Sequence, residues 1–129
     1  MPEEDPLENL YVDKDSLDRE RLSKILKKFV GIDKESGEPH FREPYHNLSN
    51  KDKLTAYLLY RRAAELLGQI DSEEVGVSSR ELSEKSGVNY NTTRGVMSKL
   101  NHVKKDKSKG GHYIPDVYIS SAMKVFEDE

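Results

Sequence analysis

The chain has 129 residues, about the length of one domain, of which 34% are hydrophobic and 35% are charged. It contains no cysteine, which excludes disulfide bridges and thiolate metal sites, and its net charge of −3 argues by itself against a polyanionic partner. The acidic, proline-containing start has no apolar run behind a basic one, so we expect no signal peptide or membrane anchor and a cytoplasmic protein.

Residues 1–14 are predicted to be a flexible acidic N-terminus. Residues 15–48 are predicted to form a helix followed by an irregular hairpin or loop. Ser16 can cap a helix that runs to about Lys28, in which apolar residues recur at helical spacing: Leu22, Ile25, Leu26 and Phe29. A turn at Glu35-Ser36-Gly37 then favours a hairpin with these arms: Val30 and Ile32, and His40 to Arg42.

A long helix over residues 50–67 opens the main domain, which we expect to span residues 49–129. Ser49 or Asn50 supplies its cap and Gly68 its stop. Its apolar residues cover more than half of the circumference, which predicts a central helix contacted on two sides. An acidic connection over residues 69–77 follows.

Two short helices joined by a tight turn are predicted over residues 79–86 and 89–100. Ser78 and Glu81 form a capping box for the first helix, and Gly87 stands where the chain reverses through a positive φ. Val88 fills the angle between the helices, and Asn89 caps the second one. The second helix then has one inward face, made of Thr93, Val96, Met97 and Leu100.

The outward face of the helix over residues 89–100 is polar. The N-terminal half of a recognition helix enters the major groove of DNA, where Arg, Asn and Thr can read base edges. We therefore expect four residues to face the major groove: Tyr90, Asn91, Thr92 and Arg94. Packing on its own helix is an equal alternative for Tyr90, and Ser98 and Lys99 are expected to face phosphates. Gly95 marks a close approach to DNA or to a neighbouring helix.

Residues 102–119 are predicted to form a basic β-hairpin with a glycine pair at its tip. Residues 94–112 carry six basic residues and one acid, a local excess of +5, whereas residues 1–48 carry 8 basic and 12 acidic ones. Because salt screens charges beyond roughly 8–10 Å, a phosphate responds to the local excess. A lysine run taken alone is more typical of a solvated loop. Next to the two helices, however, we expect four lysines to lie along phosphates: Lys104, Lys105, Lys107 and Lys109.

Residues 54–119 resemble the winged helix-turn-helix superfamily of DNA-binding proteins, and the layout is similar to small archaeal winged-helix proteins. The segment 81–88 (Glu-Leu-Ser-Glu-Lys-Ser-Gly-Val) carries the match, with Ser83 where alanine is usual. The resemblance implies a mainly α fold with a small β-wing, here with an N-terminal helical extension. Two features depart from the pattern: the short link between Leu100 and Val103, and Gly95 inside the recognition helix.

These patterns predict a non-enzymatic protein that binds double-stranded DNA with sequence preference, a small transcriptional regulator. The alternative is a winged-helix adaptor that binds protein through its acidic first half. RNA binding is disfavoured because the aromatic stacking signatures of single-strand readers are absent. The sequence has no phosphate loop or nucleophile motif, and its histidines lack ligand spacing, so we expect no catalytic residue, metal or cofactor.

Residues 120–127 are predicted to form a short C-terminal helix with Met123 and Phe126 on one side. This side can cover the domain's own core. It can also form a homodimer contact together with the first helix, and we favour that second interpretation.

Overall fold

The computed structural model describes residue 7 and residues 14–127, with side chains of α1 described from residue 19 onward. Most of the predicted N-terminus at 1–14 therefore lies outside the described residues. The described part is mainly helical, with two two-stranded antiparallel sheets. Its elements are α1 (Lys14–Leu26), β1 (Val30–Ile32), β2 (Pro39–Phe41), α2 (Glu43–His46), α3 (Asn50–Leu66), the 3₁₀ turn η2 (Ser72–Glu74), α4 (Ser79–Ser86), α5 (Tyr90–Met97), β3 (Lys104–Asp106), the 3₁₀ turn η3 (Lys107–Lys109), β4 (Gly111–Tyr113) and α6 (Asp116–Glu127).

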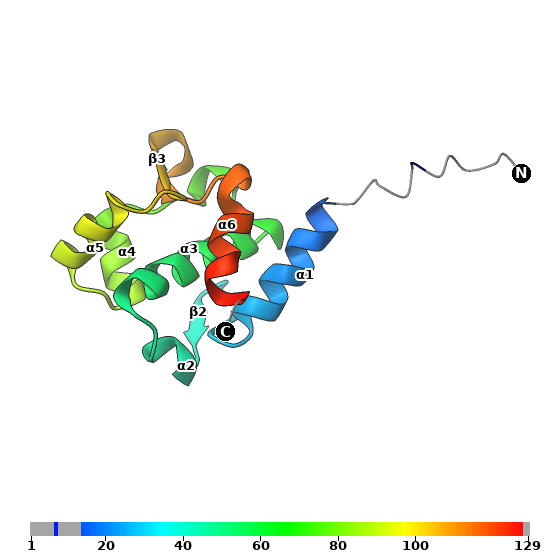
Figure 1. Ribbon diagram of the computed structural model, residues 1–129, viewed down its shortest axis with the longest axis horizontal. Coiled ribbons are helices and arrows are strands. Elements are labelled where there is room, and N and C mark those ends of the chain that lie inside the picture. Colours follow the sequence, from blue (N-terminus) through cyan, green and yellow to red (C-terminus); the bar gives the residue numbers. More distant parts are fainter. Residues whose placement is uncertain (1–6, 8–13, 128–129) are drawn as a thin grey trace, which may run out of the picture.

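The central element is α3, which corresponds to the helix predicted over residues 50–67. The Ser49 side chain accepts a hydrogen bond from the backbone N–H of Asp52 at 3.2 Å and so caps the helix. Every residue from Leu54 to Tyr60 is buried, which covers the whole circumference of two turns. Helices α1, α4, α5 and α6 all pack against α3, and Figure 1 shows it in the middle of the molecule. The prediction of a central helix is confirmed.

The irregular hairpin predicted after the first helix is present as β1 and β2. Val30 lies opposite Phe41, and Ile32 lies opposite Pro39. The Asp33 carboxylate closes the turn by accepting hydrogen bonds from the backbone N–H groups of residues 36 and 35, at 2.9 and 2.8 Å. These bonds hold the pKa of Asp33 below its usual range.

Helices α4 and α5 are joined by the turn that the sequence predicts. Gly87 has a φ of 82°, a conformation that strains any residue carrying a Cβ, and it ends α4. Val88 is buried, and its carbonyl accepts a hydrogen bond from the Ser83 hydroxyl at 2.6 Å. The Asn89 side chain accepts from the first backbone N–H groups of α5. However, α5 ends at Met97, so the predicted helix over residues 89–100 is too long.

The second hairpin consists of β3 and β4, joined through η3. It is fixed to the start of α4 by Val77, whose backbone exchanges two hydrogen bonds with His112 at 2.9 and 2.7 Å. Gly111 makes this approach close, because a Cβ at that position would lie 2.5 Å from the carbonyl oxygen of Val77. Two parts of the hairpin, η3 at Lys109 and β4 at His112, are therefore fixed by backbone hydrogen bonds to residues 76–77, just before α4.

The predicted hairpin over residues 102–119 and the predicted helix over 120–127 both need correction. The strand β4 ends at Tyr113, and α6 already begins at Asp116, directly after Pro115. Three consecutive β-prone residues, Val117 to Ile119, favour a strand locally. The helix prevails because its apolar residues share one face at spacings of three, four and seven, all of them buried: Ile119, Ala122, Met123 and Phe126.

Helices α1 and α6 lie side by side on the far side of α3 from α5 (Figure 1). The rings of Phe29 and Phe126 are 5.3 Å apart between centroids. The Arg21 guanidinium donates to the Ser120 hydroxyl at 3.0 Å and to the Glu127 carboxylate at 2.5 Å. The apolar faces that suggested a dimer contact are thus buried within one chain, in a core continuous with that of α3 to α5. Dimerisation itself stays a prediction.

Candidate nucleic-acid interface

A groove of about 610 Å³ lies where the N-terminal ends of α4 and α5 meet the second hairpin. Helix α4 contributes Arg80, and the residues Ser78 and Ser79 at its start. Helix α5 contributes Tyr90 and Arg94. The hairpin contributes the remaining lining residues: Lys105, Lys107, Gly110 and Gly111.

Four cations line this groove: Arg80, Arg94, Lys105 and Lys107. None of the nine lining residues is acidic, and none of the ion pairs among the described residues involves one of these four cations. Their charges therefore remain uncompensated by carboxylates. Such a concave cationic surface attracts a polyanion, because the electrostatic potentials of its neighbouring cations add together within the groove.

Tyr90 holds two of these cations in place. The Arg80 guanidinium carbon lies 4.8 Å from the centroid of the Tyr90 ring, and that of Arg94 lies 5.7 Å from it. Both distances are within the range of cation–π attraction. Tyr90 thus contacts Arg94 of its own helix and Arg80 of α4 and also lines the groove, and contact of its ring with a base stays a prediction. The tyrosine brings one arginine from each helix to the same floor of the groove.

The second hairpin separates two neighbouring lysines. Lys105 lines the groove, whereas the ammonium group of Lys104 lies 5.6 Å from the ring centroid of Tyr118 in α6. Successive side chains of a strand point to opposite faces of a sheet. The structure therefore brings Lys105 to the groove and not Lys104, and contact of either lysine with phosphates stays a prediction.

The tip of the hairpin divides the remaining two lysines. Lys107 lines the groove, whereas Lys109 is half-buried and is not among the lining residues. The carbonyl of Lys109 accepts the backbone N–H of Gly76 at 2.7 Å. Asp106 organises this tip by accepting the hydroxyl and the backbone N–H of Ser108, which hold the pKa of the carboxyl below its usual range.

His112 connects the hairpin to the groove wall. Its Nε2 atom lies 3.0 Å from the Ser79 hydroxyl oxygen, within hydrogen-bond distance. Burial, and then the nearby charge of Lys105, lower the pKa of His112 below 6.5. The imidazole is therefore neutral at pH 7, and the positive charge of the groove comes from arginine and lysine.

The remaining predicted residues of α5 lie outside the groove lining. Asn91, three residues before Arg94, is exposed, and Thr92, two residues before it, is half-buried. Ser98 and Lys99 are exposed beyond the end of the helix, where the Ser98 hydroxyl donates to the carbonyl of Gly95 at 2.8 Å. A Cβ added to Gly95 would meet no atom within 4 Å. Gly95 therefore makes no close approach to a neighbouring helix of this chain.

Sequence reasoning missed the residues that α4 contributes, above all Arg80. The signal was present, because Ser78 marks the helix start and Arg80 follows two residues later on an exposed position. Periodicity alone shows only that Arg80 points outward. That it points toward Tyr90 depends on the angle between α4 and α5.

The described residues contain no group of three or more histidine, aspartate or glutamate side chains that could hold a metal ion. Within the same residues, no helix has the length and apolar character needed to cross a membrane. Neither a protein-family model, a curated protein nor a solved structure matches the chain.

Proposed function

We propose that this protein binds double-stranded DNA through a winged helix-turn-helix and acts as a small transcriptional regulator. The observation that carries the proposal is the groove lined by four cations without carboxylate partners, between two short helices and a β-hairpin. DNA presents a dense row of phosphates, and a protein gains affinity by neutralising them.

The order of elements supports the winged-helix interpretation. Helices α3, α4 and α5 and the hairpin β3–β4 follow one another, and Val77, just before α4, forms an isolated β-bridge with His112 of β4. In this arrangement α5 is the recognition helix and the hairpin is the wing. Arg94, Asn91 and Thr92 would face base edges, while Lys105 and Lys107 would face the phosphate backbone.

A second candidate function is protein binding as an adaptor, and the net charge of −3 favours it. The docking surface would then be the acidic first half of the chain, where residues 1–48 carry 8 basic and 12 acidic residues. The two functions differ in what they predict for duplex DNA of random sequence. A DNA-binding protein retains non-specific, salt-dependent affinity for any duplex, whereas an adaptor has no such requirement.

The test is fluorescence anisotropy with a labelled random-sequence duplex at several salt concentrations. We expect saturable binding whose logarithmic affinity falls linearly with the logarithm of salt concentration. Replacing Lys105 and Lys107 by alanine should reduce that slope by about one to two units. A matched control, Lys24→Ala with Lys28→Ala, removes the same charge from the α1 region and should leave the slope unchanged.

Absence of measurable binding to the duplex at low salt would contradict the proposal and favour the adaptor function. An equal loss in the control and groove variants would instead show that only net charge matters, and would rule out the groove as the DNA contact.

A further inference from the structure

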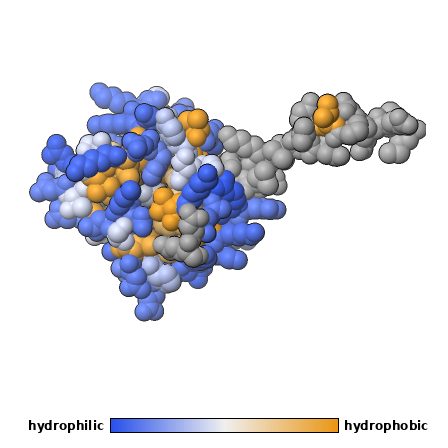
Figure 2. Space-filling view, viewed as in Figure 1, coloured by the Kyte–Doolittle hydropathy of each residue, from blue (hydrophilic) through white to orange (hydrophobic). Residues whose placement is uncertain are grey.

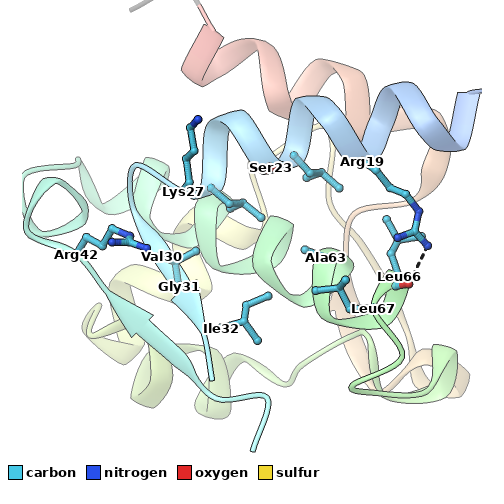
Figure 3. A pocket seen from close by; sticks show the side chains of 12 residues that line it. Arg19, Ser23, Lys27, Val30, Gly31, Ile32, Arg42, Ala63, Leu66 and Leu67 are labelled. Atoms are coloured by element: carbon cyan, nitrogen blue, oxygen red, sulfur yellow. Dashed lines mark hydrogen bonds between the residues drawn. The ribbon is translucent and has the colours of Figure 1, made fainter. Parts of the chain in front are cut away.

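A second cavity, of about 370 Å³, lies on the other side of the molecule from the basic groove, between α1, the hairpin β1–β2 and the C-terminal half of α3. Figure 3 shows its lining from close by. Sites for small molecules in proteins range from roughly 300 to 1,000 Å³, so this cavity has the size of a small-ligand site.

The walls of the cavity are apolar. The buried side chains of Leu22, Leu26 and Val30 form its floor. Ile32, Ala63 and Leu66 line it further out and are only partly buried. Leu67 also lines the cavity and is 61% exposed, which is unusual for a large apolar side chain. The apolar lining therefore continues to the surface without being covered.

The rim of the cavity is cationic. Arg19, Lys27 and Arg42 are the charged residues that line it, and no acidic side chain accompanies them. Arg19 is already engaged, because its guanidinium donates to the carbonyl of Leu66 at 2.9 Å and completes the end of α3. Among the described residues, Lys27 and Arg42 make no hydrogen bond or ion pair through their side chains.

In Figure 3 both residues lie across the cavity from Arg19. The Arg42 guanidinium points toward Val30 and Gly31, and the exposed Lys27 side chain extends from α1 above it. Arg42 reaches this side across the hairpin: its Nη2 atom lies 3.4 Å from the position that a Cβ on Gly31 would take. A ligand with an anionic head on this side and an apolar body toward Ala63 and Leu67 would match both halves of the lining.

We propose that this cavity binds a small amphipathic carboxylate, with its carboxylate group at Lys27 and Arg42 and an aliphatic chain along the apolar walls. The cationic rim without acidic residues selects an anion over a neutral or cationic amphiphile. The uncovered apolar lining selects a chain-bearing ligand over an inorganic anion. The proposal does not depend on DNA binding, since none of the cavity residues lines the basic groove.

The test uses the full chain and two probes of equal chain length, decanoate and decanol, below the concentration at which decanoate forms micelles. Isothermal titration calorimetry should show decanoate binding saturably to one site. Decanol should bind roughly five- to tenfold more weakly, since contacts with partly exposed cations contribute modestly each. The double variant Lys27→Ala/Arg42→Ala should bind both probes with the same weak affinity.

Two further variants locate the probe. Lys24→Ala/Lys28→Ala removes two cations near the cavity that do not line it, and should bind decanoate like the natural protein. Ala63→Leu places extra atoms in the cavity and should weaken both probes at least fivefold. Thermal unfolding of each variant checks that it is folded. If Ala63→Leu does not fold, the comparison of Lys27→Ala/Arg42→Ala with Lys24→Ala/Lys28→Ala still decides.

The proposal is overturned if decanoate does not bind saturably, or if decanoate and decanol bind the natural protein equally. It is also overturned if the control double variant loses as much affinity as the rim double variant, or if a folded Ala63→Leu protein binds as before. A loss of DNA binding in the groove variants, or its absence in the natural protein, would leave these results unaffected.

Discussion

Arg80 of α4 and Tyr90 of α5 are in contact, with the guanidinium carbon 4.8 Å from the centroid of the ring. This contact joins the two helices on the side that faces the basic groove. It also keeps a positive charge in a defined place, since a cation over an aromatic face is attracted by the ring quadrupole. The groove is therefore arranged before any partner arrives, which lowers the entropy cost of binding.

We expect Arg80→Ala to weaken binding to duplex DNA and to reduce the salt slope by about one unit, because one phosphate-directed charge is lost. Fluorescence anisotropy at several salt concentrations measures both effects. Lys85→Ala is the matched control, because Lys85 lies on the same helix but does not line the groove. Its ammonium nitrogen lies 3.9 Å from a carboxylate oxygen of Glu38. Equal losses of DNA affinity and of salt slope in the two variants would show that the position of Arg80 in the groove does not matter for binding.

Lys104 and Lys105 are neighbours in the sequence but lie on opposite faces of the second hairpin. We expect Lys105→Ala to weaken duplex binding severalfold at low salt, and Lys104→Ala to change it little, because the Lys104 ammonium group lies over Tyr118. The two variants have the same composition and net charge, so their difference reports position alone. Indistinguishable affinities in a titration at low salt would contradict this prediction.

Gly95 is exposed on α5, and an added Cβ would meet nothing in the chain. We expect Gly95→Ala to raise the free energy of unfolding by about 0.5–1 kcal/mol, since alanine restricts the unfolded chain and favours helix. If α5 enters the major groove, the same change should weaken DNA binding by filling the space that a base or phosphate approaches.

Urea unfolding and duplex titration of Gly95→Ala separate these two effects. A more stable protein with weaker DNA binding supports contact between DNA and this face of α5. A more stable protein with unchanged binding would place the DNA away from Gly95.

His102 and His112 make the stability depend on pH. Burial lowers the pKa of both imidazoles below 6.5, and the charges of Lys51 and Lys105 add to the effect at His102 and His112, respectively. The unfolded chain then binds protons more readily than the folded one as the pH falls through 6.5. The contribution of the two neutral imidazoles to the free energy of unfolding is thus complete above pH 6.5. It is lost progressively as the pH falls toward the folded-state pKa values.

We therefore expect a smaller free energy of unfolding at pH 5.5 than at pH 7.5, measured by urea denaturation at both values. The loss should be smaller in His102→Gln, which has no titrating group at this position. The carboxyl groups with lowered pKa, those of Asp33, Asp106 and Glu127, start from values of 4.5 or below and titrate outside this window. Equal stability at the two pH values would contradict the prediction.

The local elements could be predicted because their signals are local. A capping serine at Ser78, a glycine at Gly87 and a second cap at Asn89 each fix a backbone conformation within a few residues. The periodicity of α3 likewise predicts a central helix, since a face wider than half the circumference needs neighbours on more than one side.

Features that depend on tertiary packing could not be predicted. The segment from Val117 to Ile119 is β-prone, and it is helical because Ile119 joins a buried face that continues to Phe126. Arg80 and Lys104 are both cations at outward positions, and only the orientation of their elements sends one into the groove and the other onto Tyr118. Figure 2 shows the surface seen in Figure 1 as mostly hydrophilic, with small separate hydrophobic areas, so exposure alone does not mark a site.

The packing of α1 against α6 has a consequence for the order of folding during synthesis. Contacts such as those from Arg21 to Ser120 and Glu127 span 99 and 106 residues. Phe29, three residues after the end of α1, has no Phe126 ring to pack against until α6 has been synthesised. Helix α1 packs against α3 as well as against α6. A nascent chain halted before residue 116 would therefore leave the side of α1 that α6 covers open to chaperones and proteases.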